Sequence, residues 1–220
     1  MPRRAWWMLL AVLVVVFGLT TWVAGQRDEP VLPAGVQRLG PEAGEPVTAY
    51  LRRANASLPA GHSSHWALVQ LDSYLTTDRA AELTQGVRLS KVVFRVPLPR
   101  VQTALITRDL SGQQPVAELA RAQRSAAADR LAVSRTAPES RRAAVAAAEA
   151  TQLDRGCACV LALLVFGDGG ALHAVATRPD ARAVQAALSD TSIEDLAISP
   201  LLPEQTQTAG PVPDDGPAPS

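Results

Sequence analysis

The chain has 220 residues and carries 21 basic and 21 acidic side chains, so its formal charge is zero. That length fits one folded domain with appendages rather than two full domains and an anchor. The balanced charge provides neither the basic excess typical of nucleic-acid binding nor an acidic tail, and we therefore expect no nucleic-acid partner.

An uncharged apolar run from Ala5 to Ala24 follows a short N-terminus that contains Arg3 and Arg4. As a helix this run spans about 30 Å, which matches the hydrocarbon core of a bilayer. We predict a transmembrane signal anchor at residues 5–24, with residues 1–4 in the cytoplasm because basic residues favour that side. A cleaved signal peptide is the alternative, since Val23-Ala24-Gly25 resembles a cleavage site.

The remainder of the chain is then expected outside the cytoplasm. Its basic residues are one lysine and otherwise arginines, and alanine is abundant, a composition typical of GC-rich bacterial genomes. We therefore predict a single-pass protein of a bacterial cell membrane that contacts the lipid bilayer through residues 5–24.

Proline and glycine mark both ends of the exterior part. They predict a linker at residues 25–45 and a disordered proline-rich tail at residues 209–220. Between these two segments, residues 46–208 are expected to form one extracytoplasmic α+β domain.

The first half of this domain alternates between helix and strand. The predicted elements are a helix at 47–57, a strand at 66–71, a helix at 78–85 opened by Thr76 or Thr77, a strand at 90–96 and a third strand at 101–107. In the strand at 90–96, alternation places Val92, Phe94 and Val96 on one face and the residues between them on the other.

An alanine-rich segment from Pro115 to Asp154 follows, with fourteen alanines between Ala117 and Ala150. Alanine is the best helix former, and Pro138 is the only breaker within that stretch of alanines, so we predict two helices that meet near residues 136–138.

The last part of the domain is predicted to contain three strands and a helix. The apolar run 157–166 is read as a strand, Gly167-Asp168-Gly169-Gly170 as a hairpin turn, and residues 172–177 as its partner strand. A helix at 179–188 and a short strand at 196–199 complete the order.

These elements favour an α+β sandwich of the split βαβ, or ferredoxin-like, kind, with the alanine-rich helix pair inserted. An unrelated mixed α+β layer is the alternative. Residues 67–99 and 174–203 share a strand, helix, strand and proline-pair pattern, which raises the hypothesis of an internal duplication.

Cys157 and Cys159 are the only cysteines. On a regular strand their Cα atoms would lie about 6.5–7 Å apart, near the upper limit for a disulfide, and a bond between them would need a bend such as Gly156 permits. Free thiols at the start of a buried strand, a local or intermolecular disulfide, a redox pair and metal thiolates all remain open.

The three histidines, His62, His65 and His173, could be combined with the cysteines or with acidic residues into a metal site. No compact zinc-binding spacing supports that combination. No G-x-S-x-G motif marks Ser63 or Ser64 as a nucleophile, although a serine, a histidine and an acid could meet in the fold.

We expect a single-pass membrane-anchored extracytoplasmic protein of the bacterial cell envelope that acts as a non-catalytic protein-binding or scaffold module. Its partner is expected to be an envelope protein or a second copy, with no catalytic, cofactor or metal site. One alternative is an envelope enzyme or metal-dependent hydrolase that uses His62, His65, His173 and acidic residues. Another is a homo-oligomeric structural protein that associates through the alanine-rich helices.

Overall fold

The structure is a computed structural model that describes residues 35–217. The predicted cytoplasmic N-terminus, the anchor at 5–24 and the linker residues before 35 lie outside the described residues. Residues Gln37–Ser220 form a compact unit of their own, separate from Met1–Val36. Within residues 35–217, no helix combines the length and the hydropathy that crossing a bilayer requires.

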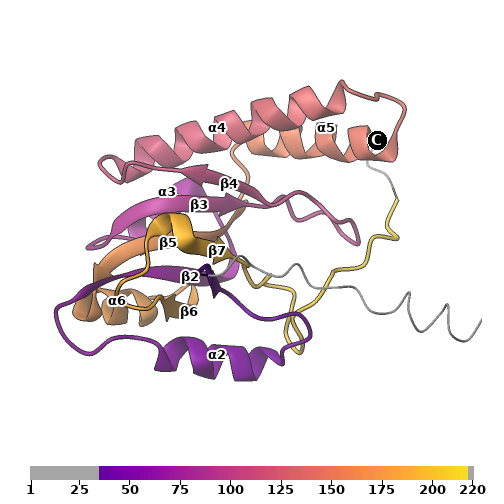
Figure 1. The fold of residues 1–220 in the computed structure, drawn as a ribbon. Helices are drawn as coiled ribbons and strands as arrows, with labels where there is room; N and C mark the ends of the chain where they lie inside the picture. The colour runs from indigo at the N-terminus through magenta and orange to yellow at the C-terminus, as the bar shows by residue number, and fades with distance from the viewer. Residues whose placement is uncertain (1–34, 218–220) are drawn as a thin grey trace, which may run out of the picture. The chain divides into compact units, whose positions relative to one another are not determined.

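An antiparallel five-stranded sheet forms the centre of the unit, with the strand order β4-β3-β5-β2-β6 (Figure 1). A separate parallel pair joins β1 to β7. With the helices described below, these strands confirm the predicted α+β class. The strands are β1 (Gln37–Leu39), β2 (Ser64–Leu75), β3 (Arg88–Phe94), β4 (Ile106–Asp109), β5 (Val160–Asp168), β6 (Ala181–Ala186) and β7 (Leu196–Ile198).

Two strand-helix-strand units interleave within the large sheet. Helix α3 (Thr77–Leu83) connects β2 to β3, and helix α6 (Gly169–Ala176) connects β5 to β6. Strand β5 lies between β2 and β3, while β2 lies between β5 and β6. Each unit is therefore split by a strand of the other unit.

Helices cover one side of the sheet, which we call the helix face. It carries the largest buried cluster, with Val69, Phe94 and Leu163 from the strands packed against side chains of α3, α4 (Pro115–Ser134), α5 (Arg141–Asp154) and α6. The helices α4 and α5 run side by side (Figure 1). Their inward alanines are buried, so small side chains allow close packing inside the unit.

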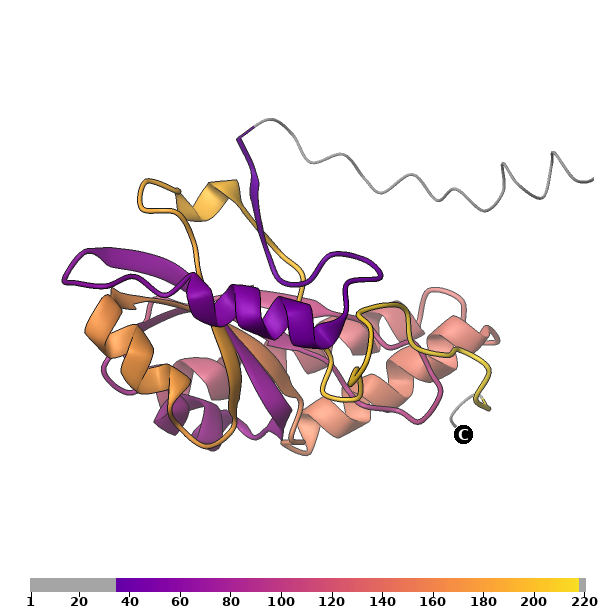
Figure 2. The ribbon, with the colours of Figure 1, turned by 90° about the horizontal axis from the view of Figure 1, so that it is seen from below.

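The opposite side, which we call the loop face, is covered by α2 (Val47–Ala56), the β1–β7 pair and irregular chain. Its sheet residues include Leu68, Leu161 and Leu164, and Leu39 and Leu202 pack on them from the covering segments. Seen from below, α2 lies in front of the sheet, and the turn with a short 3₁₀ helix, η1 (Ile193–Asp195), lies beside β1 (Figure 2).

The structure confirms most of the predicted elements in the first two thirds of the domain. Helix α2, strands β2 and β3, and the two alanine-rich helices occur where the pattern places them. The Thr76 hydroxyl accepts a hydrogen bond from the Arg79 N–H and caps α3. Val92, Phe94 and Val96 share one face as predicted, and that face is the helix face, whereas Val93 faces the other side.

Two predicted elements near the C-terminus have the wrong type. The predicted strand at 172–177 is instead the end of α6 with its C-cap Thr177, and the predicted helix at 179–188 contains strand β6. Gly167-Asp168-Gly169-Gly170 is not a hairpin turn, because the Asp168 carboxylate accepts the Ala171 N–H at 2.8 Å and begins α6. Residues 183–186 are buried on both faces of the sheet, which overrides the helix preference of their alanines.

Both predicted appendages also differ where they are described. Residues 37–39 of the predicted linker form β1, and residues 209–217 of the predicted tail lie against the domain. The Ala209 N–H donates to the Glu45 carbonyl, and the Gly216 N–H donates to the Arg100 carbonyl. Proline does not prevent this packing, because extended chain can bind through its remaining backbone groups.

The proposed duplication between residues 67–99 and 174–203 has no counterpart in the elements. The first segment contains strand, helix and strand, whereas the second contains the end of α6, β6, η1 and β7. The two strand-helix-strand units of the sheet begin at Ser64 and at Val160 instead.

Candidate functional site

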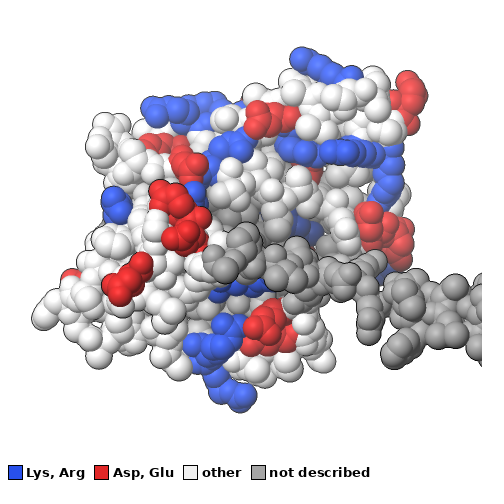
Figure 3. All heavy atoms as spheres, in the orientation of Figure 1, with Lys and Arg blue, Asp and Glu red and all other residues white. Residues whose placement is uncertain are grey.

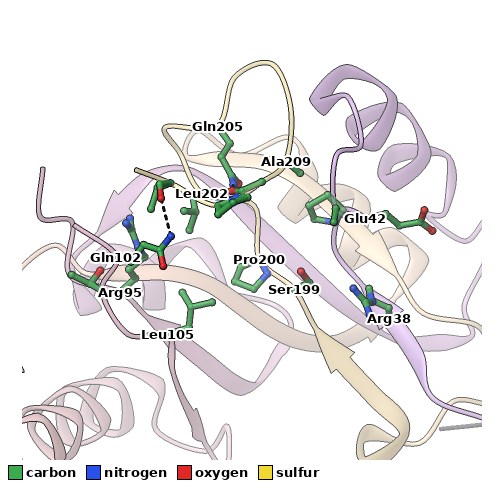
Figure 4. Close-up of a pocket in the computed structure, with 16 residues that line it drawn as sticks. Arg38, Glu42, Arg95, Gln102, Leu105, Ser199, Pro200, Leu202, Gln205 and Ala209 are labelled. Carbon is green, nitrogen blue, oxygen red and sulfur yellow. Dashed lines mark hydrogen bonds between the residues drawn. The ribbon is translucent and has the colours of Figure 1, made fainter. Parts of the chain in front are cut away.

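A groove on the loop face is the candidate site. It consists of two adjoining hollows, of about 360 Å³ and about 440 Å³, that share Arg95 and Val212 in their linings. Cavities of this size are within the range of ligand-binding sites. Arg95 and Gln102 lie at one end of the first hollow and Arg38 at the other, with Ser199 and Pro200 between them (Figure 4).

Three irregular segments form the walls of the groove. They are residues 38–43, which include the end of β1, residues 95–105 after β3, and residues 199–213 after β7. Each segment contains proline, once in 38–43 and repeatedly in the other two, and proline keeps the chain extended and limits its pairing with the sheet. The groove therefore forms where irregular chain, rather than a helix, covers the sheet.

Buried glutamines of the sheet hold two of these walls. The Gln70 side chain donates to the Tyr50 hydroxyl at 2.8 Å and accepts the Leu201 N–H at 2.9 Å. The Gln185 side chain accepts the Gly40 N–H at 2.8 Å. Because buried amides that lost these bonds would be costly, the glutamines fix the walls in place.

Gly40 is required for the close approach of two walls. Its φ is +128°, and a Cβ placed there would lie 1.7 Å from the Ser199 carbonyl oxygen. No larger residue fits without moving the β1–β7 pair.

The rim of the groove at Leu105 is supported from the helix face. Glu149 of α5 is fully buried, accepts the Ala104 N–H at 2.6 Å and pairs with the Arg130 Nε at 2.5 Å. The next residue, Leu105, is 52% exposed and lines the first hollow. An exposed leucine beside prolines makes this rim a contact surface for an apolar side chain.

The C-terminal segment closes the groove by polar contacts to the 95–105 wall. Gln102 donates its side-chain N–H to the Val212 carbonyl at 2.9 Å, and its backbone N–H to Asp214 at 3.0 Å. Arg141 at the start of α5 also pairs with Asp214 at 3.1 Å. These bonds lower the pKa of the Asp214 carboxyl, the backbone bond from Gln102 having the largest effect.

Arg95 lies where the two hollows meet, and its side chain is 3% exposed. Its Nη1 donates to the Tyr74 hydroxyl and to Glu204, the latter at 2.6 Å. The Tyr74 hydroxyl in turn donates to Glu204 at 3.1 Å. Burial raises the pKa of Tyr74 to about 12, so its hydroxyl stays protonated at neutral pH.

The other lining residues are mainly apolar. Leu105, Pro200, Leu202 and Val212 contribute carbon surface to the first hollow. Arg38 adds a second guanidinium, which makes no ion pair with another described residue. Arg100 and Glu204 line the second hollow and Glu42 lines the first, and of these Arg100 is paired with Asp215 and Glu204 with Arg95. A mostly apolar groove in which Arg38 and Arg95 supply cationic groups can bind a chain that carries apolar and acidic groups.

Sequence reasoning did not identify this site. Arg95 was placed on a strand face, and its neighbours in the groove come from segments interpreted as linker, loop or tail. One signal was available, because Pro97-Leu98-Pro99 and Pro200-Leu201-Leu202-Pro203 lie in opposing walls. Sequence alone does not bring two proline-rich segments together.

The two cysteines are bonded to each other, with their Cα atoms 5.3 Å apart. They precede β5, which begins at Val160, so the strand spacing expected for them does not apply. Gly156, with φ +76°, supplies the bend between α5 and this turn. Cys159 is fully buried and Cys157 partly so, and Gln123 donates to the Cys157 carbonyl at 3.1 Å.

The histidines do not gather into a metal site. His65 is buried in β2, with its Nδ1 3.2 Å from the Ala187 carbonyl and its Nε2 3.0 Å from the Ser63 hydroxyl. His62 and His173 are exposed. Among residues 35–217, no three histidine, cysteine or acidic side chains are close enough together to hold a metal ion. Ser63, which directly precedes β2, and His65 in β2 both lie outside the groove lining.

Basic and acidic side chains are interspersed over the face of the molecule shown in Figure 3. Ion pairs such as Arg108–Asp129 and Lys91–Asp109 join a partly buried cation to an exposed carboxylate. Comparison with protein-family models, curated proteins and solved structures finds no match to the chain. The chemistry of the groove is therefore inferred from its own geometry.

Proposed function

We propose that the chain is a single-pass membrane-anchored extracytoplasmic protein of the bacterial cell envelope, and that its domain is a non-catalytic protein-binding module. The binding site is the groove on the loop face. We also assign the interleaved strand-helix-strand units to a split βαβ, ferredoxin-like arrangement, extended by β4 and the α4–α5 pair.

One observation carries this proposal: a preformed, mainly apolar groove runs along the loop face, and Leu105 is exposed on its rim. Grooves that bind peptides typically combine an apolar lining, exposed apolar side chains on the rim and a few polar groups inside. The bonds from Glu149, Gln70 and Gln185 hold the walls before a ligand arrives, which lowers the entropic cost of binding.

A photo-crosslinking amino acid at position 105 of the full chain in living cells tests the binding function. We expect one covalent adduct, with the partner peptide identified by mass spectrometry. The matched control is the same amino acid at position 188, because Leu188 is 73% exposed and lies outside the groove lining. Adducts at both positions, or at neither, would contradict binding through the groove.

A second variant asks whether the adduct depends on the hollow itself. Ala43 is exposed and lines the first hollow, so Ala43→Trp should fill it without disturbing the buried core. The crosslink from position 105 should then fall at least tenfold, and an unchanged yield would place the partner outside the groove.

Membrane topology has a separate test. A protease added to intact spheroplasts should digest the domain of the full chain and leave only a small anchored fragment, because the proposal places the domain outside the cytoplasm. A cytoplasmic marker protein must survive the same treatment. Full protection of the domain would reverse the proposed orientation, and release without protease would indicate a cleaved signal peptide.

A further inference from the structure

Arg95 has an unused hydrogen-bonding edge. All of its side-chain hydrogen bonds leave from Nη1, toward Tyr74 and Glu204. Its Nε and Nη2 donate to no other described residue. These two nitrogens lie on the same side of a guanidinium, where their N–H groups form a fork that matches the two oxygens of a carboxylate.

Arg95 lines both hollows, which places its unused edge beside the groove. No enclosed side-chain nitrogen or oxygen of the described residues lacks a hydrogen-bond partner. Nε and Nη2 are not among such atoms, and the Arg95 side chain keeps 3% of its surface exposed. The accessible space around Arg95 is that of the two hollows, both of which it lines.

Glu204 neutralises Arg95 only in part. Its side chain is 42% exposed and contacts Nη1 alone, so water weakens the pair. A buried guanidinium with two free donors favours a second anionic partner that brings its own oxygens.

We propose that Arg95 binds the side-chain carboxylate of an acidic residue in an extended segment of the partner protein, through its Nε and Nη2 fork. This inference rests on the proposed binding function and names the group that the groove recognises. Backbone on either side of the acidic residue lies in the two hollows, because both meet at Arg95. An apolar side chain of the same segment contacts Leu105, Pro200 and Leu202.

An interior acidic residue fits this geometry better than a chain terminus. The groove continues past Arg95 in two directions, toward Ser199 in one hollow and toward Pro97 in the other. A terminal carboxylate at Arg95 would leave one hollow empty. Arg38, at the far end of the first hollow, supplies a second point for an acidic residue of the same segment (Figure 4).

The direct test uses small probes and the nitrogen-15 resonance of the Arg95 Nε–H in the full chain in detergent micelles. N-acetyl-glutamate α-amide carries one side-chain carboxylate, and N-acetyl-glutamine α-amide is its neutral isostere. We expect the first probe to shift this resonance saturably and the second to bind at least tenfold more weakly. Equal effects of the two probes, or no effect of either, would overturn the proposal.

Two further probes separate other sources of negative charge. N-acetyl-leucine presents only a terminal carboxylate, and inorganic phosphate presents an anion without a backbone. Both should bind more weakly than N-acetyl-glutamate α-amide. Stronger binding of N-acetyl-leucine would replace the interior acidic residue with a chain terminus, and stronger binding of phosphate would replace the peptide with a phosphate group.

Arg95→Lys keeps the charge but removes the fork together with the reporter Nε–H, so in this variant binding is followed by the backbone amide resonances of Gln102 and Leu105, which line the first hollow. The variant should bind the glutamate probe about tenfold more weakly. The matched control is Arg108→Lys, because Arg108 is also partly buried and paired, but outside the groove lining. Should Arg95→Lys fail to fold, the comparison of the two wild-type probes still decides. If position 105 forms the crosslink but Arg95 does not prefer the glutamate probe to the glutamine probe, only this inference is overturned. If Arg95 prefers the glutamate probe but position 105 forms no crosslink, only the proposed function is overturned.

Discussion

The two faces of the sheet are stabilised by different means. On the helix face, apolar strand residues pack against four helices, and the buried side chains form one large cluster. The loop face has two smaller clusters, and its covering segments are held by side chains of the sheet such as Gln70 and Gln185. Helices that pack by shape leave little free volume, whereas irregular chain held at a few polar points leaves a groove.

We therefore expect the helix face to contribute most of the stability and the loop face to supply the proposed binding site. Cores packed by helices tolerate little rearrangement, while hydrogen-bonded loop walls can present side chains to a partner. The most sensitive comparisons use matched residues, one on each face.

The two partly buried Arg–Glu pairs are the first such match. Glu149→Ala removes a fully buried carboxylate and leaves Arg130 and the Ala104 N–H without their acceptor. We expect the free energy of unfolding to fall by about 4 kcal/mol, measured by urea denaturation. Glu204→Ala should cost only about 1 kcal/mol, because Glu204 is 42% exposed and solvent can reach Arg95 through the groove.

A change at Glu149 should also affect the groove. Glu149→Gln keeps an acceptor for the Ala104 N–H and should preserve the crosslink at position 105 better than Glu149→Ala. If Glu149→Ala and Glu204→Ala lower the free energy of unfolding equally, the ion pairs on the two faces contribute equally to stability and the proposed difference is wrong.

Adjacent leucines of β5 provide the second match, because Leu163 faces the helix side and Leu164 faces the loop side. Leu163→Ala leaves a cavity between strands and helices and should cost about 3 kcal/mol. Leu164→Ala should cost about 2 kcal/mol, since the irregular covering chain can collapse into the space. Thermal unfolding of both variants checks the order, and a larger loss at Leu164 would reverse the comparison.

The sequence predicted the helix face well for a physical reason. Periodic apolar and alanine patterns are local, and the residues that cap or break helices, such as Thr76 and Pro138, act within a few positions. The exceptions are α6 and β6. Asp168 caps α6, a helix whose sequence pattern is typical of a strand, and β6 is a strand that contains buried alanines, which favour a helix. Burial on both sheet faces decided that case, and burial is not a local property.

The groove could not be predicted in the same way. Its walls come from residues separated by more than a hundred positions, as in the hydrogen bond from Gln102 to Val212. Arg95 is recognisable as a charge on a strand, but its free edge depends on where Tyr74 and Glu204 lie. The Cys157–Cys159 bond forms because the two residues lie in a turn before β5. The sequence does not show this turn, and it therefore left free thiols, a disulfide, a redox pair and metal thiolates open.

The N-terminal end of α4 offers a prediction that concerns the helix face alone. Glu118 accepts hydrogen bonds from the Ser111 hydroxyl and from backbone N–H groups of residues 111–114, and these bonds lower its pKa to about 2, the Ser111 hydroxyl bond having the largest effect. Glu118→Gln should therefore cost about 1.5 kcal/mol at neutral pH. In the wild type this contribution is lost as pH falls from about 4.5 toward 2, and the variant should lack that part of the acid dependence.

The smallest effect at neutral pH is expected at the two tyrosines, both of which touch the loop face. Burial raises the pKa of Tyr50 and of Tyr74 to about 12, against about 10 when exposed. Between these values the unfolded chain binds fewer protons than the folded one, so stability falls as pH rises from about 10 to 12. Ultraviolet absorbance should detect no tyrosinate until the pH approaches 12, and Tyr74→Phe should remove one of the two late-titrating groups. Tyrosinate that appears near pH 10 while the helix signal persists would mean that the loop face opens independently of the helix face.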